Sequence, residues 1–148
     1  MRVLVLQTYK EYLALFVSII NTLSLLTIKL KYYPMVIIAN MTSKQHILTF
    51  KRSADAVYAM GDFTSATILY FKTLFALHDY LLLEKIGYAP KDHTERFRLL
   101  QQEFPELYAE LDAEFNTYRS TYTRIASKET CNRIKKMIEH AITTHHIA

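Results

Sequence analysis

Apolar residues recur at intervals of three and four positions from about residue 42 to near the end of the chain, which predicts a protein built from α-helices. Thr42 and Gln45 have the spacing of a capping box, and the amphipathic helix that follows is expected to end near Gly61. Asp62 is a favourable N-cap for a second helix, which is expected to stop at Gly87. Because this second helix is apolar over most of its circumference, we expect it to lie at the centre of the fold.

Signals for three further helices follow. Asp92 and Glu95 form a second capping-box pattern, which opens a short helix reaching about Glu103. Pro105 suits the first turn of the next helix, whose apolar face is expected to continue to residue 125, and Ser127 can cap the last helix. With only two glycines and three prolines in 148 residues, a fold rich in hairpins is disfavoured. The sequence therefore predicts an all-α fold, specifically an antiparallel four- to five-helix bundle.

The first forty residues differ in character from the rest. No charged residue occurs from Tyr12 to Ile28, and this run of 17 residues is at the lower limit of the length that can cross a bilayer. Three interpretations remain open: a packing or subunit-pairing helix, a membrane-associated segment, and an extension upstream of a compact domain that starts near Met41. We therefore divide the chain into a hydrophobic N-terminal extension, residues 1–40, and a helical bundle, residues 41–148.

The formal net charge is +4, and its distribution along the chain is uneven. Acidic side chains dominate residues 103–114, whereas residues 119–136 are mostly basic. A basic block of this kind fits either a phosphate-binding surface or a solvated helix face. Tyr118 and Tyr122 lie among the first of these cations and are expected to pack inward. The candidate phosphate-binding residues are Arg119, Arg124, Lys128 and Lys136.

Cys131 is the only cysteine, so no disulfide can form within the chain and a cysteine-based zinc site is excluded. We expect Cys131 to be a small buried apolar residue, and a reducing, cytoplasmic compartment is the default. The chain has no phosphate-binding loop, cofactor fingerprint or convincing set of metal ligands, so we expect neither a metal nor a cofactor. His78 falls among apolar residues and is expected to be a buried, hydrogen-bonded core histidine, whereas His93 is expected to serve in a turn.

Residues 56–100, AVYAMGDFTSATILYFKTLFALHDYLLLEKIGYAPKDHTERFRLL, contain a characteristic order of features. A helix ends in Gly-Asp, a long aromatic-rich helix follows and ends at a glycine, and a Pro-x-x-His-Thr turn leads into a short helix. This order resembles that of HEPN domains, which are small all-helical modules of prokaryotic toxin, defence and nucleotidyltransferase-associated proteins. The resemblance extends over about residues 42–141 and does not include the first forty.

Active members of the HEPN family carry an Arg-x(4–6)-His motif, which Arg133 and His140 match with six residues between them. The resemblance implies that Arg133 would bind the scissile phosphate of an RNA, while His140 would be the general base or acid for attack by the 2′-hydroxyl, without a metal. On a helix the two residues lie within about 20° of each other and point away from the apolar stripe of Ile134 and Ile138. The pair is therefore either an active site or two polar residues on a solvated face.

Three functional hypotheses follow. The first is a non-catalytic or weakly active HEPN-like binding module that contacts RNA, a nucleotide or a nucleotidyltransferase-type partner through its basic end. The second is a metal-independent endoribonuclease of toxin type, with Arg133 and His140 as the catalytic residues. The third is a structural partner protein, held at a membrane by the segment from Tyr12 to Ile28. For the binding module and for the enzyme we expect a homodimer.

Overall fold

The computed structural model describes residues 17–24 and 43–147. The chain divides into two units, Met1–Ile38 and Ala39–Ala148. In the first unit, residues 17–24 form a helix whose residues are all exposed. The rest of the segment from Tyr12 to Ile28 lies outside the described residues, as does Thr42 with its predicted cap, so the three interpretations of the N-terminal segment stay open.

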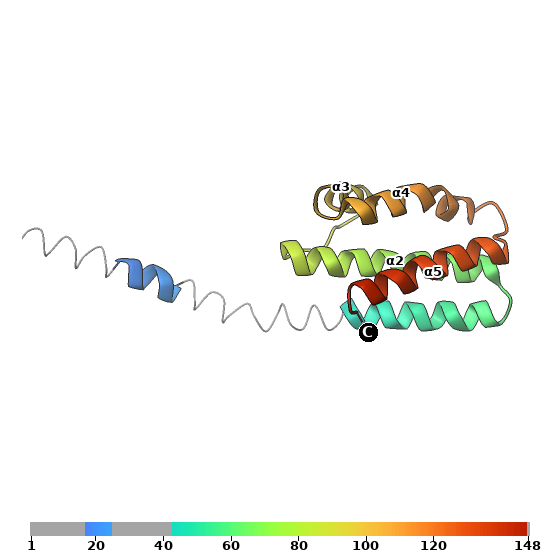
Figure 1. The fold of residues 1–148 in the computed structure, drawn as a ribbon, viewed down its shortest axis with the longest axis horizontal. Helices are drawn as coiled ribbons and strands as arrows, with labels where there is room; N and C mark the ends of the chain where they lie inside the picture. The colour runs from blue at the N-terminus through green and yellow to red at the C-terminus, as the bar shows by residue number, and fades with distance from the viewer. Residues whose placement is uncertain (1–16, 25–42, 148) are drawn as a thin grey trace, which may run out of the picture. The chain divides into compact units, whose positions relative to one another are not determined.

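All regular elements in the described ranges are α-helices, which confirms the all-α prediction. In the second unit, residues 43–59 are helical, and we call this element the 43–59 helix. Four labelled helices follow it in Figure 1: α2 (Phe63–Ile86), α3 (His93–Glu103), α4 (Pro105–Ser120) and α5 (Lys128–Thr144).

The helices begin and end where the sequence places their caps. The Asp62 side chain accepts a hydrogen bond of 3.0 Å from the backbone N–H of Ser65 at the start of α2. Gly87 ends that helix in the left-handed conformation, with φ of 84°, which a glycine adopts without strain. Ser127 caps α5 by accepting a 3.1 Å hydrogen bond from the N–H of Thr130.

The start of α3 is a variant of the predicted capping box. Asp92 accepts a hydrogen bond of 2.8 Å from the N–H of Glu95, as expected. The Glu95 carboxylate accepts a hydrogen bond of 3.0 Å from the N–H of Lys91. In the usual capping box it would accept from the N–H of the N-cap residue itself, one position later. Pro105 occupies the first turn of α4, also as expected.

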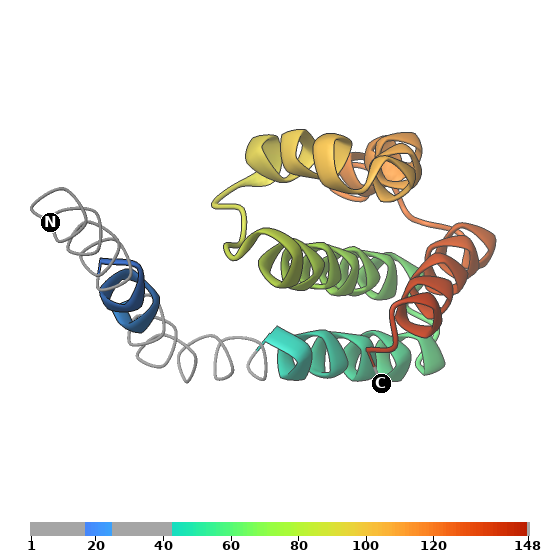
Figure 2. The ribbon, with the colours of Figure 1, turned by 60° about the vertical axis from the view of Figure 1, so that its left-hand side comes forward.

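The central position predicted for the second helix is confirmed. α2 lies between the 43–59 helix on one side and the layer formed by α3 and α4 on the other, and α5 packs against it (Figure 1 and Figure 2). Its fully buried side chains include Tyr70, Phe71, Leu74, Leu77 and Leu82. α2 is also the one helix in the described part of the chain that is long and apolar enough to cross a membrane, but 67% of its most apolar window is buried inside the bundle.

The expectation that the apolar face of α4 continues to residue 125 is wrong, because α4 ends at Ser120. Tyr118 is buried, as expected, but Tyr122 and Ile125 lie in the connection to α5 and are exposed. The hydroxyls of Ser120 and Thr121 donate to backbone carbonyls three residues earlier, at 2.8 and 2.6 Å. Such bonds compete with the helical pattern of the backbone, which explains why the helix stops at this run of hydroxyl residues.

Candidate functional site

Arg133 is exposed on α5, but its charge is already matched by a carboxylate. Its Nε and Nη2 atoms donate to the two carboxylate oxygens of Glu114 on α4, at 2.6 and 3.1 Å. Partial burial alone would raise the pKa of Glu114, but these hydrogen bonds, with one from Thr117, hold that pKa below its usual value. The same bonds raise the pKa of Arg133. The side chain therefore ties α5 to α4 by a charge-assisted, two-point contact.

His140 is also exposed, and it lies about 10 Å further along the axis of α5. It lines a cavity of about 270 Å³ together with three acidic residues from the end of α3 and the first turns of α4: Glu103, Glu106 and Glu110. Arg133 lines a different hollow, nearer the start of α5. The structure therefore places the two residues on one face of α5 but does not bring them into one cavity, and their catalytic role stays a prediction.

All four candidate phosphate-binding residues are exposed, and none has an ion-pair partner among residues 43–147. We call them the cationic surface: Arg119, Arg124, Lys128 and Lys136. The two lysines stand about two turns apart on α5 and line a hollow of about 560 Å³, whose other lining residues are Glu129, Asn132 and Arg133. The walls of this hollow therefore carry two lysines, the arginine that is paired with Glu114, and one carboxylate.

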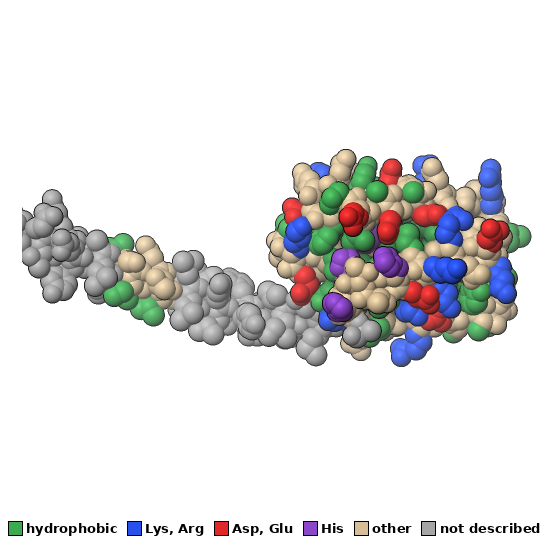
Figure 3. Space-filling model, in the orientation of Figure 1, with side chains coloured by type: hydrophobic (Ala, Val, Ile, Leu, Met, Phe, Trp, Pro, Cys, Tyr) green, Lys and Arg blue, Asp and Glu red, His purple; other side chains and the backbone are tan. Residues whose placement is uncertain are grey.

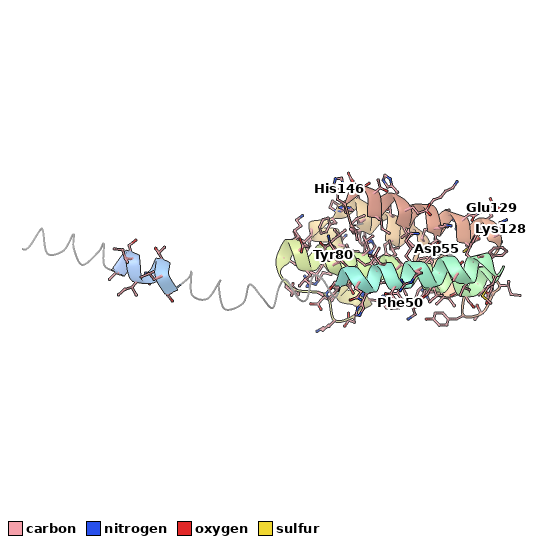
Figure 4. All side chains as sticks on the ribbon, turned by 90° about the horizontal axis from the view of Figure 1, so that it is seen from below. Phe50, Asp55, Tyr80, Lys128, Glu129 and His146 are labelled. Carbon is pink, nitrogen blue, oxygen red and sulfur yellow. The ribbon has the colours of Figure 1, made fainter. Side chains whose placement is uncertain are left out.

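Figure 3 shows how the charged side chains and the histidines are distributed over the surface of the bundle. Lys and Arg side chains, with Asp and Glu among them, lie over the half of the bundle where α5 begins, whereas the visible His side chains lie toward the end where α5 stops. Figure 4 places Lys128 and Glu129 at the first of these ends and His146 toward the other. The positive end of the α5 dipole lies beside Lys128, so the helix adds to the local positive potential instead of offsetting it.

Lys135, another cation of the basic block, contributes to the packing of the bundle. The Nζ atom of Lys135 lies 3.6 Å from a carboxylate oxygen of Asp55 and 4.8 Å from the centre of the Tyr58 ring, both on the 43–59 helix. Asp55 also accepts hydrogen bonds from the hydroxyl of Tyr70, at 2.6 Å, and from Lys51, at 2.7 Å. Burial, reinforced by the Asp55 contact, raises the pKa of Tyr70. This network joins the 43–59 helix to α2 and α5, so Lys135 is not a free cation.

One polar cluster was not predicted from the sequence. Arg96 on α3 is only 8% exposed and donates from Nε and Nη2 to the Asp79 carboxylate on α2, at 2.7 and 2.9 Å. Its Nη1 atom lies 2.8 Å from Nδ1 of His93, and its guanidinium lies 5.0 Å from the centre of the Phe75 ring. Burial and the charge of Arg96 lower the pKa of His93. The signal was present in the sequence, because Arg96 shares the apolar face of α3 with Leu99.

His78 and Cys131 both lie in the core, as predicted. His78 is 1% exposed, as expected, but its Nδ1 atom has no hydrogen-bond partner in the described part of the chain, so the expected hydrogen bond is absent at this nitrogen. Burial, with smaller effects from the charges of Arg96 and His145, lowers the pKa of His78 to about 3. Burial likewise raises the pKa of the Cys131 thiol, as expected for a packed rather than a reactive cysteine.

The described residues define an all-α protein with four exposed cations that have no ion-pair partner among residues 43–147. Within residues 17–24 and 43–147, no three acidic, histidine or cysteine side chains form a cluster that could hold a metal ion. Comparison of the chain with protein-family models, curated proteins and solved structures gives no significant match. The likeness to HEPN domains therefore rests on the sequence pattern alone.

Proposed function

We propose that this chain is a HEPN-like RNA-binding module and that the sugar-phosphate backbone of the RNA lies across the cationic surface. The observation that carries the proposal is that some cations of the basic block are paired with carboxylates and others are not. Arg133 and Lys135 are paired with carboxylates, whereas the four residues of the cationic surface are exposed and have no such partner within residues 43–147. Exposed cations without carboxylate partners are suited to bind a polyanion and release its counterions.

The hollow on α5 suits a phosphate chain better than it suits a compact acidic ligand. Its walls present Lys128 and Lys136 at two separate points, with the amide of Asn132 between them. Successive phosphates of one strand are able to occupy such points, and backbone contacts of this kind fix position without reading sequence. A single nucleotide or a nucleotidyltransferase-type protein is the alternative ligand; the HEPN resemblance is compatible with all three, and the separation of the two lysines favours an extended strand.

The geometry favours binding over cleavage. Glu114 neutralises Arg133, which would need a free guanidinium to stabilise the transition-state phosphate. His140 lies in a cavity with three glutamates, which repel a phosphate group. The endoribonuclease remains the second candidate because Arg133 and His140 share the exposed face of α5, and it requires a homodimer in which RNA displaces Glu114.

The binding proposal is tested by fluorescence anisotropy with labelled RNA and the full-length chain. Replacing Lys128→Gln and Lys136→Gln together is expected to weaken binding about tenfold, because two phosphate contacts are lost. A matched control, Lys91→Gln with Arg98→Gln, removes the same charge near the opposite end of the bundle and is expected to leave the affinity within about twofold. Equal losses in the two double variants, or no binding by the parent chain, would contradict the proposal.

The same preparation decides between binding and cleavage. RNA incubated with the full-length chain in EDTA is expected to remain intact, as are samples with Arg133→Ala and His140→Ala. Cleavage by the parent chain that disappears in both variants, with circular dichroism unchanged, would instead establish the endoribonuclease. Binding in the anisotropy experiment without cleavage here is the combination that the structure favours.

A further inference from the structure

Three large apolar side chains project into solvent from connections at one end of the bundle. Ile125, Met60 and Tyr122 are 92%, 82% and 70% exposed, the highest values among the exposed large hydrophobic residues that the structure describes. The other members of that set are between 47% and 55% exposed. We call these three residues the apolar tip. Tyr122 retains one packing contact, because its ring lies edge-on to that of Tyr118, 5.7 Å away, and the two hydroxyls are 2.9 Å apart. Isolated exposed apolar residues are common, but three at one end of the bundle indicate an interaction surface.

The apolar tip is formed by two connections that lie against each other. Met60 belongs to the turn between the 43–59 helix and α2, whereas Tyr122 and Ile125 belong to the connection between α4 and α5. The N–H of Ala126 donates to the Oγ1 of Thr64 in the first turn of α2, at 2.9 Å, and so joins the α4–α5 connection to the start of the helix that follows the Met60 turn. Figure 1 and Figure 2 both show them at the same end of the bundle.

Cations outnumber carboxylates around the apolar tip. Arg124 directly precedes Ile125, and Arg119 lies in the last turn of α4, just before the same connection. Neither arginine has an ion-pair partner in the described part of the chain. Of the acidic residues near these connections in the sequence, Asp62 caps α2 and Glu129 lies in the first turn of α5.

We infer that the apolar tip docks on the surface of an anionic phospholipid bilayer. Ile125 and Met60 would enter the boundary between headgroups and acyl chains, Tyr122 would lie at the headgroup level, and the arginines would contact lipid phosphates. Residues that project singly from turns suit a deformable lipid surface, whereas a stable protein partner needs a broad, complementary contact area. Each arginine near the surface is expected to strengthen the attraction about fivefold.

One of the three open interpretations of the N-terminal segment also brings the chain to a membrane. The segment from Tyr12 to Ile28 contains no charged residue, and its described part, residues 17–24, is a helix whose apolar residues are exposed. A segment inserted in a bilayer would tether the bundle close to the same surface. The concentration of the apolar tip at that surface would then be high, so that even weak docking is effective. The inference does not depend on RNA binding, because it is carried by the apolar residues and not by the hollow on α5.

The test uses a fluorophore that reports its local environment, so that binding through the N-terminal segment cannot be mistaken for docking of the tip. In the full-length chain with Cys131→Ala, an Ile125→Cys variant is labelled with a nitrobenzoxadiazole dye. Adding phosphatidylcholine vesicles that contain phosphatidylserine is expected to shift the emission to the blue and increase it severalfold. A matched Leu48→Cys variant carries the dye on the 43–59 helix, where the parent residue is 47% exposed, and its emission is expected to stay as in water.

A second measurement removes the apolar contacts without a dye. Ile125→Ser with Met60→Ser is expected to weaken sedimentation with phosphatidylserine vesicles at least tenfold, whereas Leu48→Ser is expected to have no effect. Because both residues of the tip lie in solvent-exposed connections, the double variant is expected to keep the parent circular dichroism spectrum.

Three results would overturn the inference. One is a dye at position 125 that stays in an aqueous environment although the vesicles bind the chain, which would assign membrane contact to another segment. Another is a double serine variant that loses affinity for RNA but not for vesicles, which would make the tip part of the RNA surface. The third is loss of self-association in that variant with no change in vesicle binding, which would make the tip a contact between two copies of the chain.

Discussion

His78 is a buried imidazole that the fold keeps neutral. The ring is enclosed by the core, and its Nδ1 atom has no hydrogen-bond partner in the described part of the chain. Burial therefore acts against the charged form, and the pKa falls to about 3. At the scale of single residues, groups of this kind couple the stability of the bundle to pH.

We expect the free energy of unfolding to fall as the pH decreases below about 6.5, the value at which an unfolded histidine takes up a proton. Between that pH and about 3 the unfolded chain binds a proton at His78 that the folded chain does not, so the loss approaches about 1.4 kcal/mol per pH unit. Urea denaturation at about pH 7.5 and pH 5 should therefore show a smaller difference for His78→Leu than for the parent, by about 2 kcal/mol. The same pH dependence in both proteins would contradict this assignment.

Arg96 contributes to stability by holding α3 against α2. Because it is buried and makes two charge-assisted bonds to Asp79, Arg96→Met is expected to cost about 2 kcal/mol in chemical denaturation. Arg98→Met on the same helix is the matched control, since Arg98 is exposed, and its cost should stay below about 0.5 kcal/mol. A double-mutant cycle with Asp79→Asn should show that the two residues are coupled, and additive effects would exclude the pair as a unit.

At the scale of elements, the sequence predicts what is decided locally and does not predict what depends on packing. The caps at Asp62, Asp92 and Ser127 are local, because each side chain bonds to a backbone group three residues away, and all three are present. The end of α4 was missed because the apolar spacing continues past it, while the hydroxyls of Ser120 and Thr121 bond to the preceding turn. The pairing of Arg96 with Asp79 was missed because it joins two helices whose packing the sequence pattern does not specify.

The Ser127 cap stabilises α5, the helix that carries Lys128 and Lys136 of the cationic surface. Ser127→Ala removes the acceptor for the N–H of Thr130 and is expected to cost about 1 kcal/mol in thermal or chemical denaturation. The same substitution at Ser53, which is exposed within the 43–59 helix, should be neutral or slightly stabilising because alanine favours a helix. Equal effects at the two positions would show that Ser127 does not act as a cap.

At the scale of the whole molecule, the candidate site was predicted in part. The cations of the basic block could be named from the sequence, but not which of them are free, because Arg133 and Lys135 are neutralised by Glu114 and Asp55 on other helices. The acidic surroundings of His140 could likewise not be named from the sequence, because α3 and α4 bring those residues beside it. A cation is available for binding only if no carboxylate of another helix is paired with it. That pairing depends on how the helices pack, which the sequence pattern does not specify.

The central claim is that the four residues of the cationic surface contact RNA phosphates, and the salt dependence of binding tests it most directly. The logarithm of the association constant of the full-length chain for single-stranded RNA is measured against the logarithm of the salt concentration. Each lost phosphate contact reduces the slope by about 0.7, so replacing all four residues by glutamine is expected to reduce it by about 3. A slope that stays unchanged in this variant would contradict the account, because the cations that bind RNA would then lie elsewhere.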